Sequence, residues 1–392
     1  MIRFLTAGES HGKGLTIIIE GIPAGLPLSE DTIAVNLARR QKGYGRGGRM
    51  QIENDHAEIL SGVRHGLTLG SPISMWIENK DWENWKGPMS INPSEEKIKR
   101  VTRIRPGHAD LPGTMKYGLD DVRNILERAS ARETAARVAA GSVAARFLQE
   151  FGFNFHSHVL SIGGVWVSST SLADIDWDTV ENSPVRCADA DAAKKMIQVI
   201  DEAKEAGDTV GGFAEVIATG VPMGLGSHIQ WDLKIDGRIA QAMMSINAVK
   251  AVSIGDGYDS ANLRGSQIHD VIDPVTDISN PWTRNTNHAG GTEGGMTDGM
   301  PLRVSFAVKP IATLAKPLPS VDLDTGASVQ AHYERSDVCQ VPPACVIGES
   351  MAALVLAESF VEKFGGDSVT ETDKNYKQYL KTIIPRGTKS KI

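Results

Sequence analysis

The sequence predicts an α+β fold, a layered sandwich in which long buried helices lie inside and sheets lie outside. Two segments indicate this, "SARETAARVAAGSVAARFLQEFG" (130–152) and "GESMAALVLAESFVEKFGG" (348–366), because each has helix-forming residues and is apolar on nearly every side. A helix that is apolar all round is buried all round, so both need cover on two faces. The predicted strands lack the short βαβ rhythm of a doubly wound sheet, and we therefore place sheets outside the helices.

Helix boundaries follow from capping residues. Ser130 is followed three positions later by Glu133, a capping-box pattern that predicts a helix start at Ser130 and an end near Gly152. The segment "DAAKKMIQVIDEAKEAG" (191–207) has apolar residues on one face only, which predicts an amphipathic helix that stops at Gly207.

Strands are predicted where β-branched and apolar residues run between turn residues. These segments are "LTIIIEGI" (15–22), "SPISMWIE" (71–78), "HVLSIGGVWV" (158–167), "GGFAEVIATGV" (211–221) and "MPLRVSFAVK" (300–309).

A short internal echo predicts a pseudo-two-fold layout. "IEGIPAGLPL" and "IATGVPMGLG" each combine the end of a strand with Gly-[Ile/Val]-Pro-x-Gly-Leu, and each precedes a predicted helix. We expect one domain over residues 1–392 with a weak internal duplication, since no low-complexity linker separates the halves. The basic tail, from about residue 380 to 392, is expected to be flexible.

Composition limits the classes of function. The 392 residues carry a net charge of −7, which argues against a nucleic-acid-binding protein. Three cysteines fit a reducing compartment, and no apolar run approaches the roughly 18 residues of a membrane span. We expect a cytoplasmic protein without nucleic-acid or membrane partners.

A basic, glycine-rich stretch stands out against this acidic background. "RRQKGYGRGGRM" (39–50) contains Arg39, Arg40, Lys42, Arg46 and Arg49. Arginine presents a planar set of donors that matches phosphate and carboxylate oxygens, and glycine lets the backbone approach a ligand closely. Alone, the stretch also fits a solvated basic loop or an RNA contact of the RGG kind.

Further arginines favour a pocket for a small polyanion. The segment "KIKRVTRIRPGHAD" contains Arg105. Two more arginines, Arg128 and Arg132, lie at the start of the first buried helix. Arg335 lies in "ERSDVCQVPPA". Arginines at the border of a buried element are costly unless they are paired, which favours an anion site over a bare surface.

Two histidines are candidates for proton transfer, His11 in "GESHG" and His108 in "RPGHAD". A lone histidine is more often structural, but both adjoin turn glycines. Asp337, beside Arg335, is either a base or a salt-bridge partner, and the residues alone favour the salt bridge. His156 and His158 lack further ligands in the sequence, so no metal site is predicted. No Walker A motif or strand-anchored GxGxxG is present.

Seven motifs then occur in the order found in one known family. "TAGESHG", "GYGRGGRM", "RPGHAD", "RASARETAARVAAG", "NHAGGTEGGMTDG", "KPIATL" and "RSDVCQVPPA" span nearly the whole chain. The chain thereby resembles the chorismate synthase family.

That resemblance implies a lyase that converts 5-enolpyruvylshikimate 3-phosphate to chorismate and phosphate. The reaction is a 1,4-anti elimination that needs reduced FMN without net redox change, at the last common step of the shikimate pathway. It also implies a homotetramer whose subunit packs long helices between two antiparallel sheets. Some members reduce their own flavin with NADPH, but no reductase element is recognised in this sequence. We therefore expect a monofunctional enzyme that takes reduced flavin from an external source, with NADPH as an indirect reductant at most.

The resemblance also implies the roles of individual residues. His11 would protonate the departing phosphate, His108 would manage the proton near flavin N1, and Asp337 would help to deprotonate N5. Substrate or NADPH contacts would fall on Arg40, Arg46, Arg49, Arg105 and Arg132. FMN contacts would fall on Arg128, Ala129, Ser130, Asn247, Ala248, Gly294, Lys309, Pro310, Ile311, Ala312, Thr313 and Arg335. Ala129 replaces the usual serine of the family, so we expect only a backbone contact there.

Overall fold

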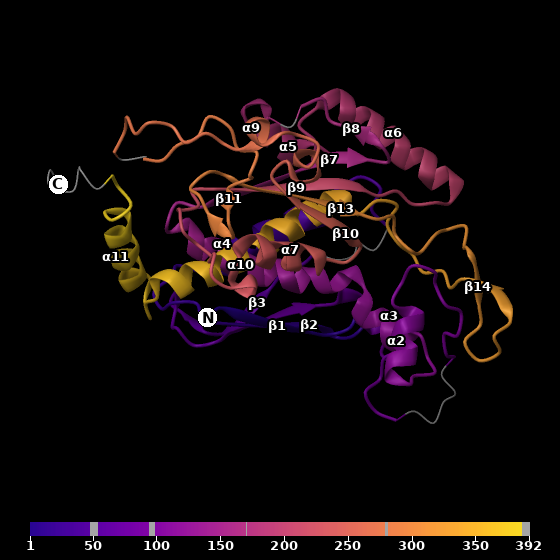
Figure 1. Cartoon of the computed structure of the whole chain (residues 1–392). Helices are drawn as coiled ribbons and strands as arrows, with labels where there is room; N and C mark the ends of the chain where they lie inside the picture. The colour runs from indigo at the N-terminus through magenta and orange to yellow at the C-terminus, as the bar shows by residue number, and fades with distance from the viewer. Residues whose placement is uncertain (48–53, 94–98, 170, 279–280, 386–392) are drawn as a thin grey trace.

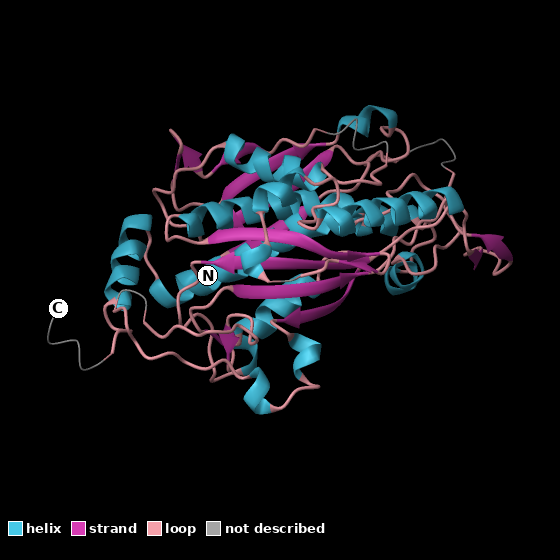
Figure 2. Ribbon diagram, turned by 90° about the horizontal axis from the view of Figure 1, so that it is seen from above, coloured by secondary structure: helices cyan, strands magenta, loops and turns pink. Residues whose placement is uncertain are grey.

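The structure is a computed structural model that describes residues 1–47, 54–93, 99–169, 171–278 and 281–385. It combines helices with antiparallel sheets, which confirms the predicted α+β class (Figures 1 and 2). Arg49 and the tail residues 386–392 lie outside the described residues, so the expectations for them stay predictions.

The first sheet has the strand order β1-β2-β6-β3 in the described part of the chain. Its strands are β1 (Arg3–Ala7), β2 (Gly14–Glu20), β6 (Ile73–Glu78) and β3 (Glu58–Ser61). Because side chains alternate along a strand, the sheet has one buried and one open face. Ile17 and Met75 form a buried pair on the inner face, whereas Leu5 and Ile18 are paired on the outer face and exposed.

The second sheet has the order β10-β13-β9-β7-β8, and its neighbouring strands are antiparallel. Its strands are β7 (Asn154–Ile162), β8 (Val165–Trp166), β9 (Gly212–Thr219), β10 (Val249–Ile254) and β13 (Leu302–Val308). Four of the five predicted strand segments each contain one strand, whereas the segment 158–167 divides into β7 and β8, which pair with each other. The sequence did not indicate β1, β3 or β10.

The two apolar helices run through the centre of the molecule (Figure 1). They are α4 (Thr134–Gln149) and α10 (Val341–Phe364). α4 contacts α10 and β2, while α10 contacts β7 and β9, so each helix is covered on two sides. Gly141 permits the close approach, because a Cβ atom there would lie 2.3 Å from the Cβ of Ser350. α1 (Glu30–Gln41) packs beside α4, and α7 (Ile235–Met244) packs beside α10.

The start of α4 differs from the prediction. The Ser130 hydroxyl accepts from the Arg132 backbone N–H at 3.2 Å, which caps a 3-10 turn at Ala131–Glu133, and the α-helix begins at Thr134. The carboxylate predicted to complete a capping box instead accepts from the hydroxyl of Thr6 at 2.8 Å.

The other helix boundaries agree with expectation only in part. α10 begins at Val341 rather than near residue 348, because prolines fill its first turn, where a missing N–H costs little. α6 (Ala190–Ala206) ends at Gly207 in the left-handed conformation, with φ 71°, as predicted.

One turn arrangement occurs twice in the chain. After β2, the Thr68 hydroxyl donates to the Pro23 carbonyl at 2.6 Å and accepts from the backbone N–H three positions beyond that proline at 3.0 Å. After β9, the Thr297 hydroxyl donates to the Pro222 carbonyl at 2.6 Å and accepts from the backbone N–H of Leu225 at 2.8 Å. The predicted echo therefore has a common local hydrogen-bond pattern, in which a short hairpin holds the chain between strand and helix. The hairpins are β4 (Val63–Arg64) with β5 (Leu67–Thr68), and β11 (Thr292–Glu293) with β12 (Met296–Thr297).

A lobe at one end of the molecule carries part of the candidate site (Figure 1). We call α2 (Asp110–Tyr117), α3 (Arg123–Ala129) and the hairpin of β14 (Pro319–Val321) and β15 (Ser328–Gln330) the end lobe. Its small apolar cluster of Val101, Ile104, Val122 and Leu126 is separate from the main core. The remaining helices are α5 (Trp177–Asn182), α8 (Gly257–Ser260), α9 (Gly265–Ile268) and α11 (Val369–Leu380).

By length and composition alone, α10 passes as a membrane span among the described residues, and 83% of its apolar window is buried inside the protein. All three cysteines are free thiols in the interior.

Candidate active site

A cavity of about 700 Å³ lies between the end lobe, the loop after β1 and the segment that follows β13. Its volume is within the range of small-molecule sites. The lining comprises Ser10, His11, Asp81, Asn84, Trp85, Arg105, Gly107, His108, Ala109, Leu126, residues 129–131, Asn247, Ala248, residues 309–313, residues 334–336 and Gln340.

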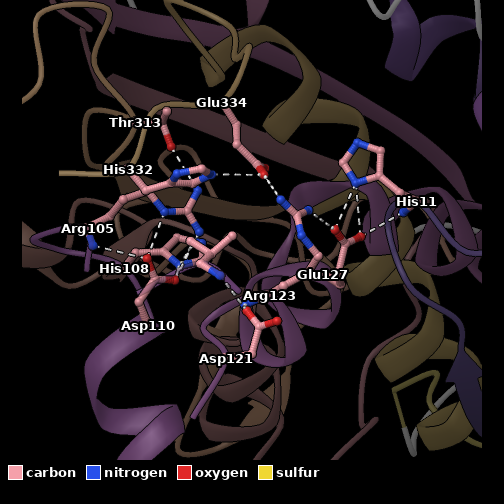
Figure 3. A network of polar contacts seen from close by, with 11 residues as sticks. His11, Arg105, His108, Asp110, Asp121, Arg123, Glu127, Thr313, His332 and Glu334 are labelled. Atoms are coloured by element: carbon pink, nitrogen blue, oxygen red, sulfur yellow. Dashed lines mark hydrogen bonds and ion pairs between the residues drawn. The ribbon is translucent and has the colours of Figure 1, made fainter. Parts of the chain in front are cut away.

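His11 is held by Glu127 of α3 (Figure 3). Glu127 Oε2 accepts from the His11 backbone N–H at 2.8 Å, and Oε1 lies 2.9 Å from Nδ1 of the ring. Arg123 donates to the same carboxylate at 2.9 Å. The imidazole also stacks on Trp85, with ring centroids 4.0 Å apart. The ring is therefore fixed at the cavity wall by an edge contact and a face contact.

His108 has a similar carboxylate partner in Asp110, the first residue of α2 (Figure 3). Asp110 Oδ1 lies 2.5 Å from His108 Nδ1, and both carboxylate oxygens accept from Arg105, at 2.8 and 3.0 Å. Burial opposes ionisation of Asp110, but the hydrogen bonds from His108 and Arg105 outweigh it and hold its pKa well below the usual range. Arg105 also donates to the Thr313 hydroxyl at 3.0 Å, which connects the end lobe to the segment after β13.

Glu334 connects the neighbourhoods of the two histidines. It accepts from Arg123 at 3.2 Å and lies 3.3 Å from His332 Nε2. Burial opposes its ionisation, but the contacts with His332 and Arg123 lower its pKa to about 2. Glu334 is therefore ionised at neutral pH and gives this part of the site a fixed negative charge.

Asn247 and Lys309 add polar groups to the cavity lining. The Asn247 amide donates to the carbonyl of Ala129 at 3.0 Å, while its Oδ1 is buried and has no partner among the described residues. An unmet buried acceptor costs about 1–3 kcal/mol, and a ligand donor would satisfy it. The next residue, Ala248, has φ 69°, and its carbonyl accepts from the Lys309 N–H at 2.9 Å. Burial, with a smaller effect of Lys250, lowers the pKa of Lys309.

Asp337 lies next to the lining residues 334–336 but outside the lining. Arg46 lies 2.9 Å from its Oδ2, and the Gly47 N–H donates to its Oδ1 at 2.6 Å. Asp337 therefore forms a salt bridge, as the residues alone favoured, but its partner among the described residues is Arg46 and not the neighbouring Arg335.

Arg40 and Arg132 do not belong to the described lining. Both contact the buried Asp55, at 3.3 Å and 2.5 Å, and Arg40 also donates to the carbonyl of Ala131 at 3.1 Å. They therefore lie behind the wall rather than on it. Burial lowers the pKa of Arg40 to about 10, against the attraction of Asp55, so this group is still cationic at neutral pH.

Two further predicted contacts lie apart from the cavity lining. Arg128 turns toward β1 and donates to the Thr6 carbonyl at 2.9 Å. Gly294 forms the turn between β11 and β12 in the left-handed conformation, with φ 60°. By contrast, the structure gathers most of the predicted set at one cavity: His11, His108, Arg105, Ala129, Ser130, Asn247, Ala248, residues 309–313 and Arg335.

Several residues of the site were missed by the sequence reasoning. Asp110 follows His108 by two positions in "RPGHAD", so a carboxylate beside an imidazole was a readable signal. Glu127 is 116 residues from His11 in the sequence, and no local pattern connects them. Trp85 and Glu334 likewise reach the site only through the fold. Within the described ranges, no group of three or more metal-ligating side chains is found.

Comparison with known proteins identifies the family. The sequence model of the family described as chorismate synthase matches residues 2–361. The chain belongs to the chorismate synthase family.

Relatives match over almost their entire length. Chorismate synthase of Symbiobacterium thermophilum is 52% identical over 98% of this chain and 100% of the relative. The enzyme of Geobacter sulfurreducens is 54% identical over 98% of this chain and 99% of the relative. A solved structure described as a crystal structure of chorismate synthase has a TM-score of 0.79 and 45% identity, and the match covers 98% of both chains. The chain is accordingly an enzyme of the lyase class.

Proposed function

We propose that this chorismate synthase family member converts 5-enolpyruvylshikimate 3-phosphate to chorismate and inorganic phosphate by a 1,4-anti elimination, with reduced FMN bound and no net redox change. The observation that supports this most is that His11, His108, Arg105 and Arg335 line one cavity. The substrate carries two carboxylates and a phosphate, and the cofactor carries another phosphate. A cavity with cationic walls suits both.

The arginines and Lys309 bind and orient the anions. At about 4 Å and an effective dielectric near 20, two opposite charges attract by roughly 4 kcal/mol. Arg105 is already fixed by Asp110 and Thr313, so its guanidinium needs little reorganisation when an anion binds. Arg40, Arg46 and Arg132 add positive potential from behind the wall, and Arg49 would complete the set.

His11 gives a proton to the phosphate oxygen as the allylic C–O bond breaks, which makes phosphate a better leaving group. His108 would hold or move the proton near flavin N1. Asp337, in the neighbouring segment, would help to deprotonate flavin N5. Their positions in or beside one cavity support these roles.

The residues present fit FMN. The buried Oδ1 of Asn247 has no hydrogen-bond partner among the described residues and could accept from a ring N–H of the flavin. Residues 309–313, which include the cationic Lys309, line the same cavity. Ala129 uses its carbonyl to hold Asn247, so the missing serine hydroxyl leaves this support intact. Ser130 would add a further cofactor contact, whereas Arg128 and Gly294 lie apart from this cavity. When bound, reduced FMN supplies transient electron donation to the substrate ring.

The direct test is an anaerobic assay of the purified chain with photoreduced FMN and the substrate. We expect stoichiometric release of phosphate and chorismate, and a loss of roughly 10²-fold or more in H108A if this residue is a general acid. No turnover with fully reduced flavin would contradict the proposal, and a near-normal rate in H108A would remove the role of His108.

A second arm concerns the origin of the reduced flavin. We propose a monofunctional enzyme that takes reduced FMN from an external reductant or reductase. NADPH oxidation by the protein with FMN alone would show instead that the chain reduces its own flavin.

We also propose a cytoplasmic homotetramer whose subunit is a single layered domain with a pseudo-two-fold repeat. The exposed Leu5–Ile18 pair on the open face of the first sheet supports burial against another subunit. The twin turns at Thr68 and Thr297 support the repeat. Analytical ultracentrifugation of the full chain would test the oligomeric state, and a monomer at micromolar concentration would contradict it.

A further inference from the structure

The two imidazoles at the cavity are held in the same way, although they come from different loops (Figure 3). Each presents Nδ1 to a carboxylate that is almost inaccessible to solvent, Glu127 for His11 and Asp110 for His108. An arginine contacts each of these carboxylates. The arrangement is carboxylate-to-imidazole anchoring, repeated at two points of one cavity.

The hydrogen-bond partners of Glu127 decide the tautomer of His11. The backbone N–H of His11 and the Arg123 guanidinium can only donate, so Glu127 accepts from both, at 2.8 and 2.9 Å. An ionised carboxylate has no proton to give to the ring nitrogen 2.9 Å away. Nδ1 of His11 therefore carries the proton, and Nε2 is the atom that gains or loses a proton.

The same reasoning holds for His108. Asp110 accepts from the backbone N–H of Arg105 at 3.1 Å and from the guanidinium of that residue. Because these donors keep the carboxylate ionised, the 2.5 Å contact with His108 is a bond from Nδ1–H to Oδ1. One guanidinium nitrogen of Arg105 also lies 3.0 Å from Nδ1 of His108. Because Nδ1 carries a proton, this nitrogen does not donate to it, and both groups donate to Oδ1 of Asp110.

We propose that Glu127 is the positioning residue for His11: it fixes the Nδ1–H tautomer, so that the ring exchanges a proton with the leaving phosphate through Nε2. Asp110 does the same for His108. The catalytic consequence rests on the proposed function, whereas the tautomer does not.

Charges around His11 support the assignment to Glu127. The packed elements contribute Glu127 and Arg123 from α3, and Asp81, which holds the stacked Trp85 through the indole N–H at 3.1 Å. Glu334 balances Arg123 from the other side at 3.2 Å. Glu127 contacts both the ring Nδ1 and the backbone N–H of His11.

The first test uses the unaltered full-length protein. ¹⁵N NMR on protein labelled at its ten histidines distinguishes a protonated from an unprotonated Nδ1, and the signal that disappears in H11Q identifies His11. We expect the neutral form of His11 to be the Nδ1–H tautomer. A neutral Nε2–H tautomer would overturn the proposal whether or not the protein makes chorismate.

The second test replaces the carboxylate by an amide. Glu127→Gln keeps the shape but offers one acceptor oxygen to three donors, so its NH₂ group faces at least one N–H. We expect kcat to fall on the order of 10²-fold with little change in KM.

Glu215→Gln is the matched control. Glu215 is 3% exposed and Glu127 2%, and Glu215 also lies between a histidine, His158 at 2.9 Å, and an arginine, Arg303 at 3.0 Å. Neither Glu215 nor His158 lines the cavity. E215Q should lose stability but keep kcat. An unchanged kcat in folded E127Q, or an equal fall of kcat in E215Q, would overturn the proposal. If E127Q does not fold, the NMR measurement on the unaltered chain decides.

Discussion

Asp110→Asn should damage the protein well beyond its own side chain. Asp110 accepts from the Arg105 backbone N–H, from two guanidinium nitrogens and from His108. Its exposed fraction is 0% and that of Arg105 is 6%, so the substitution leaves a buried guanidinium without its counter-charge. Removing one partner of a buried ion pair typically costs about 3–5 kcal/mol, and we expect the free energy of unfolding to fall by that amount.

Equilibrium urea unfolding at pH 7 measures this loss, and Asp120→Asn supplies the matched control. Asp120 pairs with Arg100 at a similar distance, 2.8 Å, but its side chain is 77% exposed, so its loss should be under about 1 kcal/mol. The pKa of Asp110 is held below that of an unfolded chain, so its contribution is present above about pH 4 and disappears as the pH falls. The deficit of D110N should therefore shrink in acid. Equal losses in D110N and D120N at pH 7 would refute the reasoning.

The remaining predictions concern packing, the repeated turn and acid stability. Gly141→Ala should destabilise the protein by about 1–3 kcal/mol, because the added Cβ would lie 2.3 Å from α10, whereas Gly87→Ala, with nothing within 4 Å, should change thermal stability little. Thr68→Ala and Thr297→Ala should each cost about 1–3 kcal/mol in urea unfolding, and a large difference between them would argue against equivalent turns. Ionised Glu334, with a pKa of about 2, stabilises the fold above about pH 4.5 and loses this effect as the pH falls toward 2, so E334Q should show a flatter stability–pH curve over that interval.

Much of the fold could be predicted because burial is written into composition. The segments that became α4 and α10 are apolar on all sides, and this alone required cover from two directions. The strands missed were short or lay at sheet edges, such as β1 and β10, where half-exposed side chains weaken the pattern. The start of α4 was predicted wrongly because Glu133 accepts hydrogen bonds from Thr6 and Arg137 and does not complete a capping box. The sequence does not show these contacts.

The candidate site divides along the same line. Glycine-flanked histidines and clustered arginines pointed to His11, His108 and Arg105 from local sequence. The partners of these groups come from distant segments, as the 116-residue separation of Glu127 from His11 shows. Sequence also could not distinguish arginines on the wall from those behind it. Arg40 pairs with Asp55 in the interior, whereas Arg335 lines the cavity.

The most direct test of the central claim is a crystal structure of the full-length protein with oxidised FMN and 5-enolpyruvylshikimate 3-phosphate. We predict that both molecules occupy the 700 Å³ cavity, with the phosphate of the substrate within hydrogen-bond distance of His11 and the flavin ring beside His108. Ligands bound elsewhere, with this cavity filled only by solvent, would contradict the account.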